Sequence, residues 1–184
     1  MFKEDPSCNR KVWTFFDGDN PIVVHNITIP DLVPEDFRLF TQNYWQIVQG
    51  IIAEDSKGPK VEFHDMGVVD GRHIMRQRMD PGVMFVSARQ TFISTYTFQE
   101  GPNELSWLAS SRENDNAETK FKDLIKKDVV ATLEVNYYNW KPTEDGKGTH
   151  LTHVTCSKPN GSIPNMVVSK MTAAQADAAI KVAA

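Results

Sequence analysis

The sequence has few of the features that mark secreted or membrane-spanning proteins. Its 184 residues include only two cysteines, Cys8 and Cys156, which lie far apart and belong to no paired motif. A disulfide framework is therefore not expected. No apolar run is as long as a membrane span, and the first residues, Met1–Pro6, contain no apolar signal core. These absences predict an intracellular protein, which we place in the cytoplasm.

The chain also lacks a large excess of charge of one sign. It has 20 Lys and Arg against 24 Asp and Glu, which gives a net charge of −4. Tight binding to a phosphate backbone needs a basic surplus, so no nucleic-acid partner is expected. Hydrophobic residues make up 40% of the chain and charged residues 24%, a composition typical of a globular protein. No linker or internal repeat divides it, so we expect a single domain over residues 1–184 and a monomer.

Local signatures of catalysis are missing as well. There is no G-x-x-x-x-G-K-S/T or G-x-G-x-x-G phosphate loop and no G-x-S-x-G elbow around a nucleophile. The nearest approach to a metal motif is His150-x-x-His153-x-x-Cys156, but this segment is strand-like, and side chains three apart on a strand point to opposite faces. Glu62 and His64 fit a solvated strand face equally well. No metal or cofactor is expected.

What the sequence does contain is an α+β pattern of strands, a helix, several consecutive antiparallel strands and a final helix. Residues 1–10 are polar and expected to be frayed. One or two helices are predicted between Pro34 and Ala53 from an amphipathic stripe, and a loop with a short helix over 112–127. Asp70-Gly71 is a two-residue hairpin signal. The strands are predicted at 11–16, 22–29, 61–69, 72–79, 83–98, 105–111, 129–140 and 149–157, and an Ala-rich helix at 169–182.

Arg89 is the most informative charged residue in these strands. If the strand over 83–98 alternates, Arg89 shares one face with Phe85, Ser87, Thr91 and Ile93. An arginine among such neighbours must be solvated, paired with a carboxylate, or turned toward a polar group of a ligand, because burial without a partner is very costly. The spacing by itself slightly favours an arginine that faces water.

Methionine is the residue in surplus. Four of the seven methionines, Met66, Met75, Met79 and Met84, fall in one short window. Because methionine is flexible, it fills irregular gaps and adapts to variable apolar partners. The cluster therefore suits a packed core, and it equally suits a cavity for a flexible lipid chain.

The carboxyl-terminal half resembles a known family. Residues 152–168 (THVTCSKPNGSIPNMVV) look like the closing segment of the START family, the steroidogenic-acute-regulatory-related lipid-transfer domains, with its Ile-Pro turn before the last helix. Residues 81–89 (PGVMFVSAR) resemble the family's proline-containing loop and the strand that bears an arginine, and residues 128–133 (DVVATL) resemble a later strand. The resemblance covers residues 61–182, with a weaker match over 13–51, and the family's first helix is missing here.

The resemblance implies a helix-grip fold, in which a curved antiparallel sheet surrounds a C-terminal helix and encloses an apolar cavity for one lipid. It also implies non-enzymatic binding and transfer of that lipid, of the sterol, phospholipid or ceramide class, with transient membrane contact. The expected lipid-binding residues are Arg89, Phe85, Ser87, Thr91, Ile93, Trp107, Met166, Met171 and Ala174. The expected gate loop consists of Asp80, Pro81, Gly82, Val83 and Met84.

Two other functions stay open from the sequence. An enzyme of the wider helix-grip superfamily, a cyclase or a hydrolase, would use the same cavity, with His64, His153 and Glu134 as acid–base groups. An interaction module would instead bind an apolar segment of a partner protein in an open groove.

Overall fold

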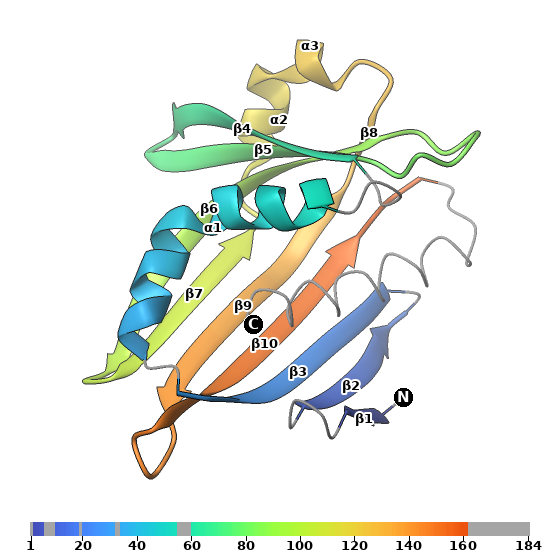
Figure 1. Ribbon diagram of the computed structural model, residues 1–184. Coiled ribbons are helices and arrows are strands. Elements are labelled where there is room, and N and C mark those ends of the chain that lie inside the picture. The colour runs from blue at the N-terminus through green and yellow to red at the C-terminus, as the bar shows by residue number, and fades with distance from the viewer. Residues whose placement is uncertain (1, 6–9, 19, 32–33, 55–59, 162–184) are drawn as a thin grey trace.

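Antiparallel strands make up most of the computed structural model, which describes residues 2–5, 10–18, 20–31, 34–54 and 60–161 (Figure 1). The amino-terminal strands are β1 (Phe2–Asp5), β2 (Arg10–Asp17) and β3 (Asn20–Pro30). The long helix α1 (Pro34–Glu54) follows them. The remaining elements are β4 (Lys60–Val69), β5 (Arg72–Asp80), β6 (Arg89–Gly101), β7 (Glu104–Ser110), α2 (Asp115–Lys120), α3 (Lys122–Ile125), β8 (Val129–Val130), β9 (Thr132–Pro142) and β10 (Gly148–Lys158).

All these strands belong to one sheet. Its order is β1-β2-β3-β10-β9-β7-β6-β5-β4, with antiparallel neighbours throughout, and β8 adds a short parallel pairing to β6. Strand β10 therefore lies between β3 and β9. As a result, residues from the two ends of the described chain meet in the middle of the sheet (Figure 1).

Most of the predicted elements are present. The hairpin at Asp70-Gly71 is confirmed, because β4 pairs with β5 and both turn residues have positive φ, 51° and 76°. Such angles are typical of the tight turn that suits the twist of a hairpin. The prediction of one or two helices after Pro34 is also confirmed: α1 contains a kink where Asn43 leaves helical geometry.

Three boundaries predicted from the sequence are wrong. Residues 2–5 are not frayed, because β1 pairs with β2. The strand expected from residue 83 begins only at Arg89: Gly82 and Phe85 have φ values of 63° and 67°, which a strand cannot accommodate. The strand expected over 129–140 is divided at Ala131, so that β8 pairs with β6 while β9 pairs with β7.

The sheet curves around helix α1. The Trp45 ring on α1 lies 4.9 Å from the Phe63 ring on β4 and 6.2 Å from the Trp107 ring on β7, measured between ring centroids. One helix can meet both strands only if the sheet bends around it. We call the side of the sheet that meets α1 the α1 face. Its buried core consists of Ile27, Tyr44, Ile93, Leu105, Trp107, Ala109, Tyr138, Trp140 and Leu151.

The opposite face is covered locally by α2 and α3. A second cluster of Val69, Ile74, Phe92 and Ala117 forms there, and the Phe92 and Phe121 rings stack 5.9 Å apart. We call this side the α2/α3 face.

The predicted α+β class and curved antiparallel sheet are thus confirmed. The C-terminal helix expected over 169–182 lies outside the described residues, and so do Met166, Met171 and Ala174. Among the helices that the structure describes, none is long and apolar enough to cross a membrane.

Candidate functional site

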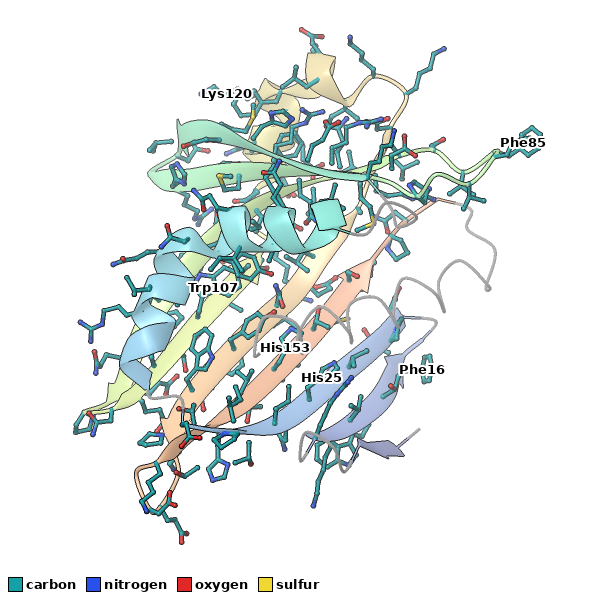
Figure 2. All side chains as sticks on the ribbon, viewed as in Figure 1. Phe16, His25, Phe85, Trp107, Lys120 and His153 are labelled. Atoms are coloured by element: carbon teal, nitrogen blue, oxygen red, sulfur yellow. The ribbon has the colours of Figure 1, made fainter. Side chains whose placement is uncertain are left out.

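A row of aromatic and histidine side chains crosses the middle of the α1 face. Directly paired residues on neighbouring strands share a face, and His153 on β10 pairs with His25 on β3 and with Tyr138 on β9. Tyr138 in turn pairs with Trp107 on β7. The His153 ring stacks on Tyr138 at 4.2 Å and on His25 at 5.2 Å, measured between ring centroids, so the row is continuous. Figure 2 labels His25, His153 and Trp107, which belong to this row.

Hydrogen bonds extend this row to the helix. The Nε2 atom of His153 lies 2.8 Å from Oδ1 of Asn136, and the Asn136 amide donates to the Tyr44 hydroxyl on α1 at 2.8 Å. The Tyr44 hydroxyl also hydrogen-bonds with Tyr138. Burial raises the pKa of both tyrosines, and that of Tyr138 lies well above its ordinary range. Both hydroxyls therefore stay protonated at neutral pH.

Both histidines of the row are buried and neutral. His25 is 0% exposed and His153 is 3% exposed. Burial lowers the pKa of His25 to about 4, with a further contribution from the nearby Arg10 cation. Burial likewise lowers the pKa of His153 to about 3, and His25 contributes to that shift. The α1 face thus presents uncharged imidazoles at pH 7.

Arg89 does not face water, contrary to the reading that its spacing slightly favours. It is 4% exposed, at the start of β6. Its guanidinium donates to the carbonyl of Ser87 and approaches the carbonyls of Pro159 and Asn160 at 3.5 and 3.4 Å. Burial lowers the pKa of Arg89. Within the described residues no carboxylate forms an ion pair with it, so its charge is balanced only by carbonyl dipoles.

The other predicted lipid-binding residues are divided between the core and the surface. Trp107 and Ile93 belong to the α1-face cluster, and Thr91 is buried beside them on β6. Ser87 and Phe85 are exposed, and Phe85 is 97% exposed. The prediction that Phe85 shares a strand face with Arg89 is therefore wrong, because the strand starts four residues later.

The predicted gate loop does form a turn between β5 and β6. Asp80 Oδ1 accepts a hydrogen bond from the Gly82 backbone N–H at 3.0 Å, which fixes the start of the turn. Beyond it, Val83, Met84 and Phe85 are all exposed, and Met84 is 78% exposed. Three consecutive apolar side chains, from Val83 and Met84 of the gate loop and from the adjacent Phe85, therefore lie in water, which is unusual for a surface turn.

The methionine cluster does not share one environment. Met75 is buried and pairs across the sheet with Ile93 on the α1 face, whereas Met66 packs on the α2/α3 face. Met79 is half-buried opposite Arg89, and Met84 lies in the exposed turn. Methionine therefore serves packing at some of these positions and a surface loop at another.

The histidines and acids considered for metal binding or catalysis are separated. His150 and His153 lie on opposite faces of β10, as the strand period predicts, and His150 is exposed and bonds to Thr28 at 3.0 Å. His64 is exposed beside Glu62, at 3.5 Å, which confirms a solvated strand face. Among the described residues, no three His, Cys, Asp or Glu side chains are placed to hold a metal ion.

Glu134 and His153 are poor acid–base groups in this arrangement. Glu134 is bound to Lys158 at 2.8 Å and to Arg112, and the hydrogen bond from Lys158 is the main cause of its lowered pKa. A general base acts best when its pKa is near the working pH, and the pKa of His153, about 3, is far below neutrality.

Sequence reasoning missed His25 and its contact with His153. A signal was present: in the segment IVVHNITI, the strand period places His25 on the same side as Val23 and Ile27. That pattern predicts a buried histidine. The register that sets it against His153 is not visible in either strand alone.

Comparison with solved structures gives the fold. The lipid transfer and protein localization domain of human StarD13 superposes with a TM-score of 0.67 at 12% identity, over 100% of this chain and 86% of that one. A STAR-related lipid transfer protein from Xanthomonas axonopodis superposes with a TM-score of 0.66 at 13% identity, over 100% of this chain and 95% of that one. Human StAR-related lipid transfer protein 5 gives 0.64 at 12% identity, over 100% and 84%.

The chain has a START-like fold. No family model matches the sequence, and no curated protein matches it either. At this level of identity the likeness extends to the course of the backbone and not to individual side chains. The function of this chain therefore has to be inferred from its own side chains.

Proposed function

We propose that residues 1–184 form one START-like domain that binds a single lipid against the α1 face and transfers it between membranes without reacting with it. The observation that supports this most is the composition of that face, on which an apolar cluster around Trp107 adjoins a small number of buried polar groups. Ligand sites for apolar molecules have this character. The similar solved structures are lipid transfer proteins by name.

The physical basis is solvation. Each CH₂ group of a lipid that leaves a membrane for water costs about 0.8 kcal/mol. A protein that surrounds the chain with apolar side chains removes most of that barrier. Trp107 and Ile93 supply such surface at the α1 face, and the proposal includes Met166, Met171 and Ala174, outside the described residues, as further lining of an enclosed cavity. The sterol, phospholipid and ceramide classes all fit this description.

Arg89 is proposed to hold the polar end of the lipid near the gate loop. It is a buried cation without an ion-paired carboxylate among the described residues, and three backbone carbonyls leave part of its donor capacity unused. Thr91 and Ser87 lie near it along the chain. A phosphate, carboxylate or hydroxyl group would complete the coordination of its guanidinium.

The gate loop is proposed to touch the membrane during transfer. Val83 and Met84 of this loop and the adjacent Phe85 form an apolar tip that is exposed in the free protein. Placing these side chains in the headgroup region of a bilayer removes them from water, and Gly82, which has no side chain, allows the turn to reorient. The loop would then open a path beside Arg89.

The test combines native mass spectrometry of the purified protein with transfer of labelled lipids between phosphatidylcholine vesicles. We expect a co-purified or added lipid to bind at a ratio of one to one and to be transferred. If no sterol, phospholipid or ceramide binds, the proposal is wrong.

A charge reversal then tests Arg89. Arg89→Glu should weaken binding of an anionic or hydroxylated lipid at least tenfold, and Arg89→Lys should retain part of it. Lys141→Glu makes a similar charge change at an exposed position on β9 and serves as the control. Equal binding by Arg89→Glu and the control would remove Arg89 from the site.

A further inference from the structure

Two buried nitrogen atoms in the middle of the α1 face have no hydrogen-bond partner. They are Nε2 of His25 and Nδ1 of His153, and neither finds a donor or acceptor among the residues that the structure describes. Buried polar groups are nearly always paired, and each exception calls for an explanation. These two exceptions lie on directly paired residues whose rings stack (Figure 2).

The other nitrogen of His25 identifies its tautomer. Nδ1 of His25 lies 3.4 Å from Nη2 of Arg10. A guanidinium can only donate, so Nδ1 must accept and carries no proton. Since the ring is neutral at pH 7, its proton is on Nε2. The unpartnered atom of His25 is therefore a hydrogen-bond donor.

The same reasoning gives the opposite result for His153. Its Nε2 atom lies 2.8 Å from Oδ1 of Asn136, whose amide nitrogen is engaged by Tyr44. A carbonyl oxygen only accepts, so Nε2 of His153 carries the proton. Because this ring is neutral as well, Nδ1 keeps a free lone pair. The unpartnered atom of His153 is a hydrogen-bond acceptor.

A donor on one ring and an acceptor on the ring stacked against it favour a particular chemical group. We propose that His25 and His153 together bind the hydroxyl group of a lipid, which accepts from Nε2 of His25 and donates to Nδ1 of His153. The inference rests on the proposed function, and it narrows the ligand to a lipid with a free hydroxyl, such as a sterol, a ceramide or a diacylglycerol. For a sterol, which has a single polar group, the two histidines take the place proposed for Arg89, whereas the other two lipids carry further polar groups that Arg89 can bind. A carboxylate or a phosphodiester offers acceptors only. One of its oxygen atoms would therefore face the lone pair of His153 with no hydrogen atom between them.

The rings are held in place for this role. His153 stacks between His25 and Tyr138, and each imidazole is fixed through its second nitrogen by Arg10 or Asn136. A hydroxyl arriving at the pair therefore meets groups that are already oriented, which limits the entropy lost on binding. A buried water molecule has the same donor and acceptor capacity, so the experiment must separate a water site from a lipid site.

The probes are two lipids with a hydroxyl, cholesterol and 1,2-dioleoylglycerol, and their methyl ethers, which accept but cannot donate. Each is presented in dioleoylphosphatidylcholine vesicles, and binding is measured by native mass spectrometry. We expect the wild-type protein to bind at least one of the hydroxyl lipids at least tenfold more tightly than its methyl ether.

Each variant removes the unpartnered nitrogen of one histidine and keeps the hydrogen bond that the other nitrogen of that ring forms. His25→Asn retains an acceptor for Arg10 but lacks Nε2, and His153→Gln retains a donor for Asn136 but lacks Nδ1. His153→Gln should bring the preference for the hydroxyl lipid below threefold, because only Nδ1 of His153 distinguishes a hydroxyl from an ether. His25→Asn should instead weaken binding of the hydroxyl lipid and of its methyl ether alike, because both oxygens accept from Nε2. The control His150→Gln changes an exposed histidine on the opposite face of β10, and it should keep the wild-type preference.

Long-range ¹H–¹⁵N spectra of the imidazoles give a second readout that does not depend on the variants folding. Addition of the hydroxyl lipid should shift the His153 Nδ1 resonance, and the methyl ether should not. Equal binding of a hydroxyl lipid and its ether by the wild-type protein would overturn the inference and leave lipid binding standing, with water as the occupant. If no probe binds and no phospholipid binds either, the proposed function fails together with it.

Discussion

The two faces of the sheet at strand β6 differ in how fully their buried polar groups are hydrogen-bonded. On the α2/α3 face, the Gln90 side chain accepts from Arg76 at 2.6 Å and donates to the carbonyl of Leu124 at 2.9 Å and to Asp128 at 2.6 Å. The buried Asn114 amide donates to the carbonyl of Phe92 at 2.8 Å. These groups tie α2, α3 and the loop after them to the sheet.

The α1 face has the larger apolar cluster, yet it keeps two imidazole nitrogens without partners within the described structure. Unsatisfied groups of this kind lower stability. The contrast indicates that the polar groups of the α2/α3 face maintain the fold, while those near His25 and His153 are available to a ligand. Four measurements test this contrast.

The largest effect is expected from the apolar centre of the α2/α3 face. Phe92→Ala removes a fully buried ring that stacks on Phe121, and such truncations cost about 3–5 kcal/mol of unfolding free energy. Chemical denaturation measures the loss. Phe98→Ala, on the same strand but half-exposed, should cost under about 1 kcal/mol. If the folded Phe92→Ala protein also loses lipid binding selectively, the assignment of the two faces is wrong.

A pH dependence is expected from the α1 face. The pKa values of His25 and His153, about 4 and about 3, lie below the value of about 6.5 in the unfolded chain. The unfolded chain therefore binds more protons, and stability falls as the pH decreases below 6.5. Between pH 7 and pH 5 each histidine should remove roughly 2 kcal/mol.

Denaturation curves at the two pH values test this, with the double variant His25→Asn, His153→Gln as the reference. The reference should show a flatter profile over the same interval. A wild-type profile as flat as that of the double variant would mean that the two imidazoles become charged at no cost, and the contrast between the faces would lose its basis.

A smaller effect is expected from neighbouring polar residues on opposite faces. Gln90→Leu removes the side-chain donor to the Leu124 carbonyl and the acceptor of Arg76 and should cost about 1–3 kcal/mol. Asp128 keeps its bond from Arg78 at 2.8 Å. Thr91→Val replaces a residue that is 9% exposed and whose hydroxyl forms no hydrogen bond within the described part of the chain, and it should change stability by under about 0.5 kcal/mol. If both variants lose the same unfolding free energy, the buried polar groups of the α1 face are hydrogen-bonded as fully as those of the α2/α3 face.

The smallest effect on stability is expected at Phe85, directly after the gate loop. Phe85→Ser alters a side chain that is 97% exposed, so the unfolding free energy should change by under about 0.5 kcal/mol. Vesicle-to-vesicle transfer should nevertheless slow severalfold, because less apolar surface reaches the bilayer. Unchanged transfer would exclude the loop tip from membrane contact.

Local signals in the sequence predicted most of the strands and turns. The Asp70-Gly71 hairpin and the helix after Pro34 follow from residue types within a few positions of each other, so they were predictable. The start of β6 was not. Residues 83–88 have strand-like composition, and only the positive φ of Gly82 and Phe85, set by the closure of the β5–β6 turn, keeps them out of the sheet.

The site was less predictable than the fold because it depends on register. Arg89 was identified as important, but its burial against the carbonyls of Pro159 and Asn160 joins segments that are distant in the sequence. His25 and His153 show the same limit: each is one histidine in a strand, and only the pairing of β3 with β10 makes them a donor and an acceptor for one group.

The position of β10 between β3 and β9 also bears on how the protein folds. Residues 148–156 must find 22–30 across most of the chain, and contacts of such long range slow folding because a large loop has to close first. Until β10 has been synthesised, β3 and β9 both present open strand edges, which invite association with other chains. The row of His25, His153 and Tyr138 is therefore completed only after strand β10 has been synthesised. A chain that stops before residue 148 should aggregate rather than form a smaller domain.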